Sequence, residues 1–249
     1  MSLLIKKIKN LLRPWKTPLV NILLLMIRLY GRNKVISGPF KGLRIPQKFP
    51  TKPMLLGVWE KELSFIWDSL QKPIYIVDVG AAEGYYAVGL AKKFPEKKII
   101  AFEMSSHNKI LLHNTIRENS VKNVEVYGKC ELSSLNSLGC KLDNSLLIMD
   151  CEGYEIELLK NFESQIFHET QILVELHEMY APGCTIELKK RFEHSHQIKE
   201  IKGEHRKIND WPTKLKFLRY IFPEKLLLLF MDEGRPYPMN WLYMSPKIY

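Results

Sequence analysis

Five short apolar runs alternate with helical stretches over residues 73–177, and this alternation constrains the fold more than any other feature of the sequence. The runs are rich in β-branched residues, as strands are, and cover 73–79, 98–103, 123–128, 145–150 and 171–177. Helical stretches lie between them at 84–94, 106–119 and 154–164. Strand–helix–strand units at this spacing form a parallel sheet with helices on both faces. We therefore predict an α/β fold with a Rossmann-like, doubly wound, mostly parallel sheet.

The pattern is less regular on either side of this region. Residues 31–72 are rich in glycine and proline, which predicts loops and short strands. Within this segment, residues 57–70 are predicted to form a helix that leads into the first strand. Beyond residue 177 we predict helices at 184–196, 212–222 and 223–231 and strands at 197–204 and 240–247. The chain is accordingly divided into a basic N-terminal helical and loop extension, residues 1–56, and one large domain, residues 57–249.

The positive charge of the chain is concentrated in its N-terminal part. The formal net charge is +10, yet no acidic residue precedes Glu60, and twelve of the 37 Lys and Arg residues do. The remaining 25 bases face 27 acids, so residues 60–249 carry a net charge of −2. An enzyme that acts on DNA or RNA is expected to be basic over its catalytic region. This distribution argues against a nucleic-acid substrate, and against DNA in particular.

The N-terminal 30 residues allow two interpretations. Residues 4–15 form an amphipathic basic pattern, and residues 19–30 are apolar nearly all round. The apolar run would reach roughly 18 Å as a helix, too short for a hydrocarbon core of about 30 Å. One interpretation is a pair of helices that pack on the surface of the domain. The other is a basic amphipathic helix on an anionic membrane surface.

The cysteines favour a reducing compartment. The four cysteines form no CxxC pair and have no zinc-ligand spacing, and a chain of this size needs no disulfides to fold. We expect a cytoplasmic protein, with peripheral contact at the inner membrane face under the second interpretation of the N-terminus.

Acidic residues lie at the ends of three predicted strands. Asp78, Glu103 and Asp150 are at or next to the carboxyl ends of the first, second and fourth runs. In parallel α/β sheets these ends share one rim, beyond which ligands bind. The three carboxylates are therefore expected at one ligand site.

The loop after the first strand favours a ligand with an amino-acid end. It contains Gly80, for a tight turn beside a ligand, and Gly84, where the next helix opens. The spacing matches neither the dinucleotide nor the triphosphate glycine motif. Helix amides favour a carboxylate, Asp78 an amine, and Glu103 the hydroxyls of a ribose. S-adenosylmethionine combines an amino acid and a nucleoside, and it is the expected cofactor.

The sequence resembles a known family at this point. "DVGAAEGYYAVGLAKKF", "IIAFE" and "LLIMDCEGYEIELL" are similar to the FkbM family of class I S-adenosylmethionine-dependent methyltransferases. The most specific likeness is the pattern Asp150, Glu152, Gly153, Glu155. The resemblance covers residues 57–180 and implies cofactor contacts from Asp78, Gly80, Ala82, Gly84, Glu103 and Asp150. The first loop departs from the family, because Ala81–Ala82–Glu83 replaces the usual Ala-Asn-x.

The resemblance implies methyl transfer to a hydroxyl oxygen, commonly of a sugar or a polyketide-like product. A hydroxyl acceptor must lose its proton, which requires a base. Asp150 is the first candidate, and Glu152 and His177 are further catalytic candidates. Glu155 also fits a helix N-terminus, and His177 also fits a purely structural role. Asp150, Glu152 and His177 have the chemistry of a divalent-metal site, but their spacing does not establish one, and no metal is expected.

Three functional hypotheses follow. The first is an O-methyltransferase for a hydroxyl of a sugar, glycan or glycolipid precursor. The second is a methyltransferase for a soluble small molecule or RNA. The third is a non-catalytic Rossmann-like binding module. Residues 235–243, with their aromatic side chains, could line an acceptor pocket or could form a proline-fixed loop before the last strand.

Overall fold

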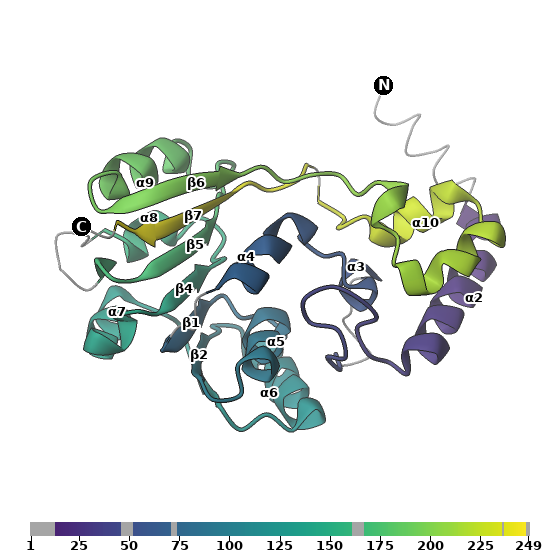
Figure 1. Cartoon of the computed structure of the whole chain (residues 1–249), viewed down its shortest axis with the longest axis horizontal. Helices are drawn as coiled ribbons and strands as arrows, with labels where there is room; N and C mark the ends of the chain where they lie inside the picture. The colour runs from purple at the N-terminus through teal and green to yellow at the C-terminus, as the bar shows by residue number, and fades with distance from the viewer. Residues whose placement is uncertain (1–12, 46–51, 71–73, 161–166, 236, 248–249) are drawn as a thin grey trace.

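A seven-stranded sheet organises one half of the molecule, at the left in Figure 1. The computed structural model of the chain describes residues 13–45, 52–70, 74–160, 167–235 and 237–247. The strand order is β3-β2-β1-β4-β5-β7-β6, and β7 runs antiparallel to both of its neighbours. The strands are β1 Tyr75–Val79, β2 Lys98–Phe102, β3 Val124–Tyr127, β4 Leu146–Met149, β5 Gln171–Glu175, β6 His196–Ile201 and β7 Trp241–Pro246. The predicted doubly wound, mostly parallel sheet is confirmed.

Helices cover both faces of the sheet. One face packs on α4 (Ser64–Ser69), α5 (Tyr85–Lys93) and α6 (Ser106–Asn119). The other packs on α7 (Leu132–Leu138), α8 (Glu155–Leu158) and α9 (Cys184–Phe192). In the central strands β1 and β4, the side chains on both faces of the sheet are buried, because helices cover both faces. This explains why their sequences are continuous apolar runs.

Strand register brings three carboxyl ends together. Asp78 in β1 is paired with Ala101 of β2 and with Ile148 of β4. Since the three strands are parallel and adjacent, Glu103 and Asp150, which follow β2 and β4, lie at the same rim. The expected convergence of acidic strand ends is confirmed.

The structure differs from several predicted helices. The helix expected over 57–70 begins only with a 3₁₀ turn at Lys61–Leu63, because Gly57 and Glu60 have φ of +77° and +43°. The predicted helix 184–196 ends at Phe192, after which β6 begins. The segment expected as a helix over 212–222 is the 3₁₀ helix η5, Thr213–Tyr220. Helix α7 was not predicted, and residues 161–166 of the predicted helix 154–164 lie outside the described residues.

A third apolar core joins residues 20–58 with residues 208–231. Helices α2 (Arg13–Gly31) and α3 (Lys52–Leu56) pack with η5 and with α10 (Glu224–Met231), at the side of the molecule away from α9 (Figure 1). Leu23 and Ile27 of α2 are fully buried in this core, together with Leu215 and Phe230. The part of the N-terminal extension that is described therefore packs on the C-terminal segment, as one interpretation of the sequence proposed.

Candidate functional site

A cavity of about 550 Å³ opens at the carboxyl rim of β1, β2 and β4. This volume is in the usual range for small-molecule sites. The cavity is lined by Val79, Gly80, Ala82, Phe102, Glu103, Met104, Ser105, Asn108, Lys129, Cys130, Asp150, Cys151, Glu152, Tyr154 and Leu158. Five of the predicted site residues are thus brought to one cavity. Asp78, Gly84 and His177 are not among its lining residues.

Two glycines shape the loop between β1 and α5. Gly80 has φ of +91°, and a Cβ atom there would lie 1.8 Å from the carbonyl oxygen of Asp150. A side chain at residue 80 would therefore push the ends of β1 and β4 apart. Gly84 also has φ of +91° and is the N-cap of α5. Both glycines thus permit the tight turn that was expected from their spacing.

Glu103 is held rigidly at the cavity wall. Its side chain is buried, Oε2 accepts a hydrogen bond from the Ala82 amide at 2.9 Å, and Oε1 accepts one from the Ser105 amide at 2.7 Å. A carboxylate oxygen can accept more than one hydrogen bond. Glu103 therefore fixes the glycine loop and keeps acceptor capacity toward the cavity.

Asp78 lies beneath this rim rather than in the cavity wall. The residue is 2% exposed, and its Oδ2 has no hydrogen-bond partner among the described residues. Burial raises the pKa of Asp78 to about 7, against the lowering effect of a hydrogen bond from the Ala87 amide. A buried carboxyl group with a free oxygen is a fitting partner for a cationic ligand group such as an ammonium.

Asp78→Asn is expected to stabilise the free protein at high pH. A carboxyl group whose folded pKa is raised contributes stability below its unfolded pKa, and this contribution is lost as the pH rises through about 7. An amide stays neutral, so the variant should have a free energy of unfolding higher by on the order of 4 kcal/mol at pH 8, shrinking toward pH ~4. Urea unfolding over this pH range measures the difference. If the free energies of unfolding of Asp78→Asn and wild type changed in parallel with pH, the prediction would be wrong. Asp68→Asn, at an exposed position on α4, is the control.

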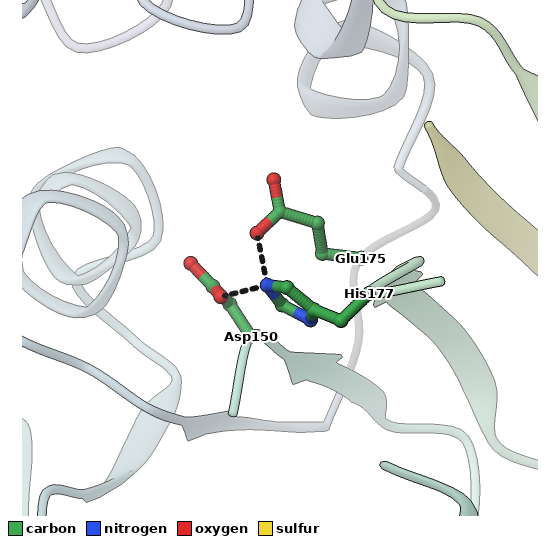
Figure 2. A group of neighbouring side chains, drawn as sticks. All are labelled: Asp150, Glu175 and His177. Carbon is green, nitrogen blue, oxygen red and sulfur yellow. Dashed lines mark ion pairs between the residues drawn. The ribbon is translucent and has the colours of Figure 1, made fainter. Parts of the chain in front are cut away.

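His177 is the centre of a buried charged cluster next to the cavity. Its Nδ1 lies 2.7 Å from Oε1 of Glu155. Its Nε2 lies 3.2 Å from Oε2 of Glu175 and 3.5 Å from Oδ1 of Asp150, as Figure 2 shows. Oε2 of Glu152 is 3.7 Å from the same nitrogen, but that side chain is 74% exposed. The imidazole thus connects the ends of β4, α8 and β5.

The carboxylates around His177 keep it charged. Burial alone would lower the pKa of His177, but hydrogen bonds to Glu155 and Glu175 outweigh burial and raise it to about 10. The pKa values of Glu155 and Glu175 are lowered in turn, since their bonds to His177 outweigh the effect of burial. Glu155 lies in the first turn of α8, as expected, and it also orients His177 and accepts hydrogen bonds from the Cys151 and Gly153 amides.

Asp150 is the group of this cluster that faces the cavity. Partial burial, and then the neighbouring Glu175 carboxylate, raise the pKa of Asp150 well above its usual value. A carboxyl group with a raised pKa is suited to accept a proton near neutral pH. A protonated imidazole has no nitrogen free to take a proton. In this arrangement Asp150 is better placed than His177 to act as a base.

Two further residues of the cluster were not predicted. Arg235 forms ion pairs with Glu175 and, at 2.7 Å, with Glu60. Glu60 is 2% exposed and accepts a hydrogen bond from the Tyr86 hydroxyl. Burial and repulsion from Glu175 raise the pKa of Glu60 to about 8, although Arg235 opposes this. No local pattern identifies these two residues, because they come from segments 175 positions apart.

Three residues of the cluster have the geometry of a cation site. One ligand atom from each of Asp150, Glu175 and His177 lies within 4.8 Å of the other two. The set differs from the one weighed from the sequence, because Glu175 takes the place of Glu152. His177 and Arg235 lie against the Glu175 carboxylate of this set.

The fold of the chain, with an antiparallel β7 between β5 and β6, is shared with solved methyltransferase structures. The structure is similar to that of the ribosomal protein L11 methylase from Lactobacillus delbrueckii subsp. bulgaricus, with a TM-score of 0.51, 15% identity, and coverage of 83% of this chain and 86% of that one. Precorrin-6y C5,15-methyltransferase from Geobacter metallireducens GS-15 matches with a TM-score of 0.49 and 12% identity over 82% of this chain and 97% of the other.

By sequence alone, no protein-family model matches the chain, and no curated protein matches it. The structural likeness therefore establishes the class I methyltransferase fold. The resemblance to the FkbM family stays a prediction.

Proposed function

We propose that the protein is an S-adenosylmethionine-dependent O-methyltransferase that acts on a hydroxyl of a sugar, glycan or glycolipid precursor. The observation that carries this proposal is the convergence of Gly80, Ala82, Glu103 and Asp150 on one cavity at the rim of β1, β2 and β4. Ligands of open α/β sheets bind at this rim. The unpartnered Oδ2 of Asp78 supports the cofactor assignment, because a cofactor with an ammonium would satisfy it.

The residues of the cavity divide into binding and proton-accepting groups. S-adenosylmethionine, when bound, supplies an electrophilic methyl group. Glu103 is expected to accept hydrogen bonds from the ribose hydroxyls, and the Gly80 and Ala82 loop to follow the cofactor closely. Asp150 holds the acceptor hydroxyl and takes its proton, while His177 and Glu175 position Asp150. Alignment of this kind contributes several kcal/mol to a displacement reaction.

The sugar acceptor is supported by the surroundings of Arg235. This residue borders a second cavity, of about 310 Å³, together with His205, Arg206, Tyr237 and other residues. Tyr237 gives this cavity an aromatic ring beside the hydrogen-bonding groups of Arg206 and Arg235. Aromatic rings beside charged hydrogen-bonding groups are suited to a polyhydroxylated ligand. The segment 235–243 was singled out from the sequence for such a role.

Titration with S-adenosylhomocysteine tests the cofactor assignment. Wild type is expected to bind in the micromolar range, and Glu103→Gln to bind about ten- to a hundredfold more weakly, since an amide cannot accept from both the Ala82 and Ser105 amides. Glu96→Gln, at an exposed position before β2 and at the opposite rim, should bind like wild type. A folded wild-type protein that binds no S-adenosylhomocysteine would overturn the proposal.

The acceptor class is tested separately with methyl-labelled S-adenosylmethionine. Nucleotide sugars, free glycans and lipid-linked sugars are offered in parallel with transfer RNA and with small phenols. Label on a sugar hydroxyl is the expected result. Label only on RNA or on a phenol would disprove the sugar assignment and leave the cofactor assignment standing.

A further inference from the structure

The outer face of α2 is apolar although it faces solvent. Leu19, Ile22, Leu25 and Leu29 are 45%, 48%, 57% and 69% exposed. Their spacings of three, three and four residues place them on one face of the helix, away from the buried Leu23 and Ile27. Helix α2 therefore has one apolar face in the third core and another that no described residue covers.

The 3₁₀ helix η5 and the residue after it extend this apolar face. Phe217, Tyr220 and Ile221 are 44%, 84% and 60% exposed. The rings of Tyr30, at the end of α2, and Phe217 have centroids 6.0 Å apart, so the two apolar surfaces meet. We call the exposed apolar residues of α2 and η5, together with Ile221, the α2–η5 face.

Basic residues lie on the segments that form and flank the α2–η5 face. Residues 18–45 contain five Lys and Arg and no acid, and residues 212–222 contain Lys214, Lys216 and Arg219 and no acid. The like charge of Lys214 lowers the pKa of the neighbouring Lys41. Like charges gathered on one surface favour an anionic partner.

We infer that the α2–η5 face docks on the surface of an anionic lipid bilayer. Exposed aliphatic and aromatic side chains at one contiguous site favour an apolar environment. The basic rim favours phosphate or carboxylate headgroups at the same surface. A second copy of the chain would bring the same positive charge against this face, which opposes self-association. This inference does not depend on the proposed methyl transfer.

We expect the α2–η5 face to bind at the membrane–water interface. No helix among the described residues is long and apolar enough to cross a membrane. A helix with an apolar face and a basic rim lies in the plane of the interface, with its apolar side chains about 5–10 Å into the headgroup and acyl boundary. Tyr30 and Tyr220 have the amphipathic rings that favour this depth.

Sedimentation with vesicles tests the inference. The full chain is mixed with vesicles of phosphatidylcholine alone, or of equal parts phosphatidylcholine and phosphatidylserine. We expect binding to the second composition and at least tenfold weaker binding to the first. Leu25→Asp/Leu29→Asp should weaken binding by at least tenfold, and Lys214→Gln/Lys216→Gln by roughly thirtyfold, with a smaller dependence on salt.

Ile186→Asp is the matched control, because Ile186 on α9 is 76% exposed and far from α2 (Figure 1). It should bind vesicles like wild type. All variants should bind S-adenosylhomocysteine like wild type, which separates this test from that of the proposed function. The inference would be overturned if wild type bound neither vesicle type. It would also be overturned if wild type formed a dimer that Leu25→Asp/Leu29→Asp does not form.

Discussion

Replacement of His177 with alanine is expected to lower the free energy of unfolding by about 3–5 kcal/mol at neutral pH. The imidazolium is 3% exposed and is held by Glu155 at 2.7 Å and Glu175 at 3.2 Å. Its removal leaves the Glu155 carboxylate buried without a cation, and Glu175 with Arg235 alone. Urea unfolding followed by circular dichroism measures the loss.

A double-mutant cycle separates the charge from the cavity left by the ring. Adding Glu155→Gln to His177→Ala removes the orphaned charge and should recover part of the stability, although Glu155→Gln alone destabilises wild type. His194→Ala, with a side chain that is 88% exposed, should differ from wild type by less than about 0.5 kcal/mol. Equal losses in the single and double variants would show that packing, not charge, is what His177 contributes.

Asp150→Asn is expected to reduce kcat by about 10²–10⁴-fold, the range for loss of a general base. An asparagine side chain has nearly the same shape but cannot take the proton of the acceptor hydroxyl. Wild-type activity should rise with pH, because the raised pKa of Asp150 keeps the carboxyl group protonated at low pH. This pH dependence should be absent from the residual activity of the variant.

The binding measurement decides between the two roles that were predicted for Asp150. If Asp150 acts as a base, the affinity of Asp150→Asn for S-adenosylhomocysteine should lie within a few-fold of the wild-type affinity. A variant that has lost the cofactor but keeps its pH profile would instead assign Asp150 to cofactor binding. Asp68→Asn, on the exposed side of α4 with Lys93, should change neither quantity.

Local sequence patterns were sufficient for the sheet and for one side of the site. Strands β1, β2 and β4 are apolar runs of four or five residues followed or ended by an acid, and parallel pairing then places Glu103 and Asp150 at one rim. Positions 80 and 84 favour glycine because their φ angles are positive. The spacing of the two glycines between a strand and a helix had predicted this tight turn. These features depend on neighbours within a few residues.

The other side of the site depends on contacts distant in sequence. Glu60 and Arg235 follow the two segments that the third core packs together, and the helical pattern predicted over 57–70 did not indicate a partner for Glu60. The three residues with the geometry of a cation site include Glu175 and not Glu152. Glu152 has φ of +56°, and its carboxylate is largely exposed. Backbone geometry of this kind is not encoded in residue spacing.

The third core also has a consequence for the order of synthesis. Leu23 and Ile27 emerge early, whereas Leu215 and Phe230, in the same core, are added almost 200 residues later. At typical translation rates this delay is roughly ten to forty seconds. During that interval the inner apolar face of α2, with Leu23 and Ile27, lacks its final C-terminal neighbours. We therefore expect the nascent chain to need a chaperone or another apolar surface near the ribosome before the core can close.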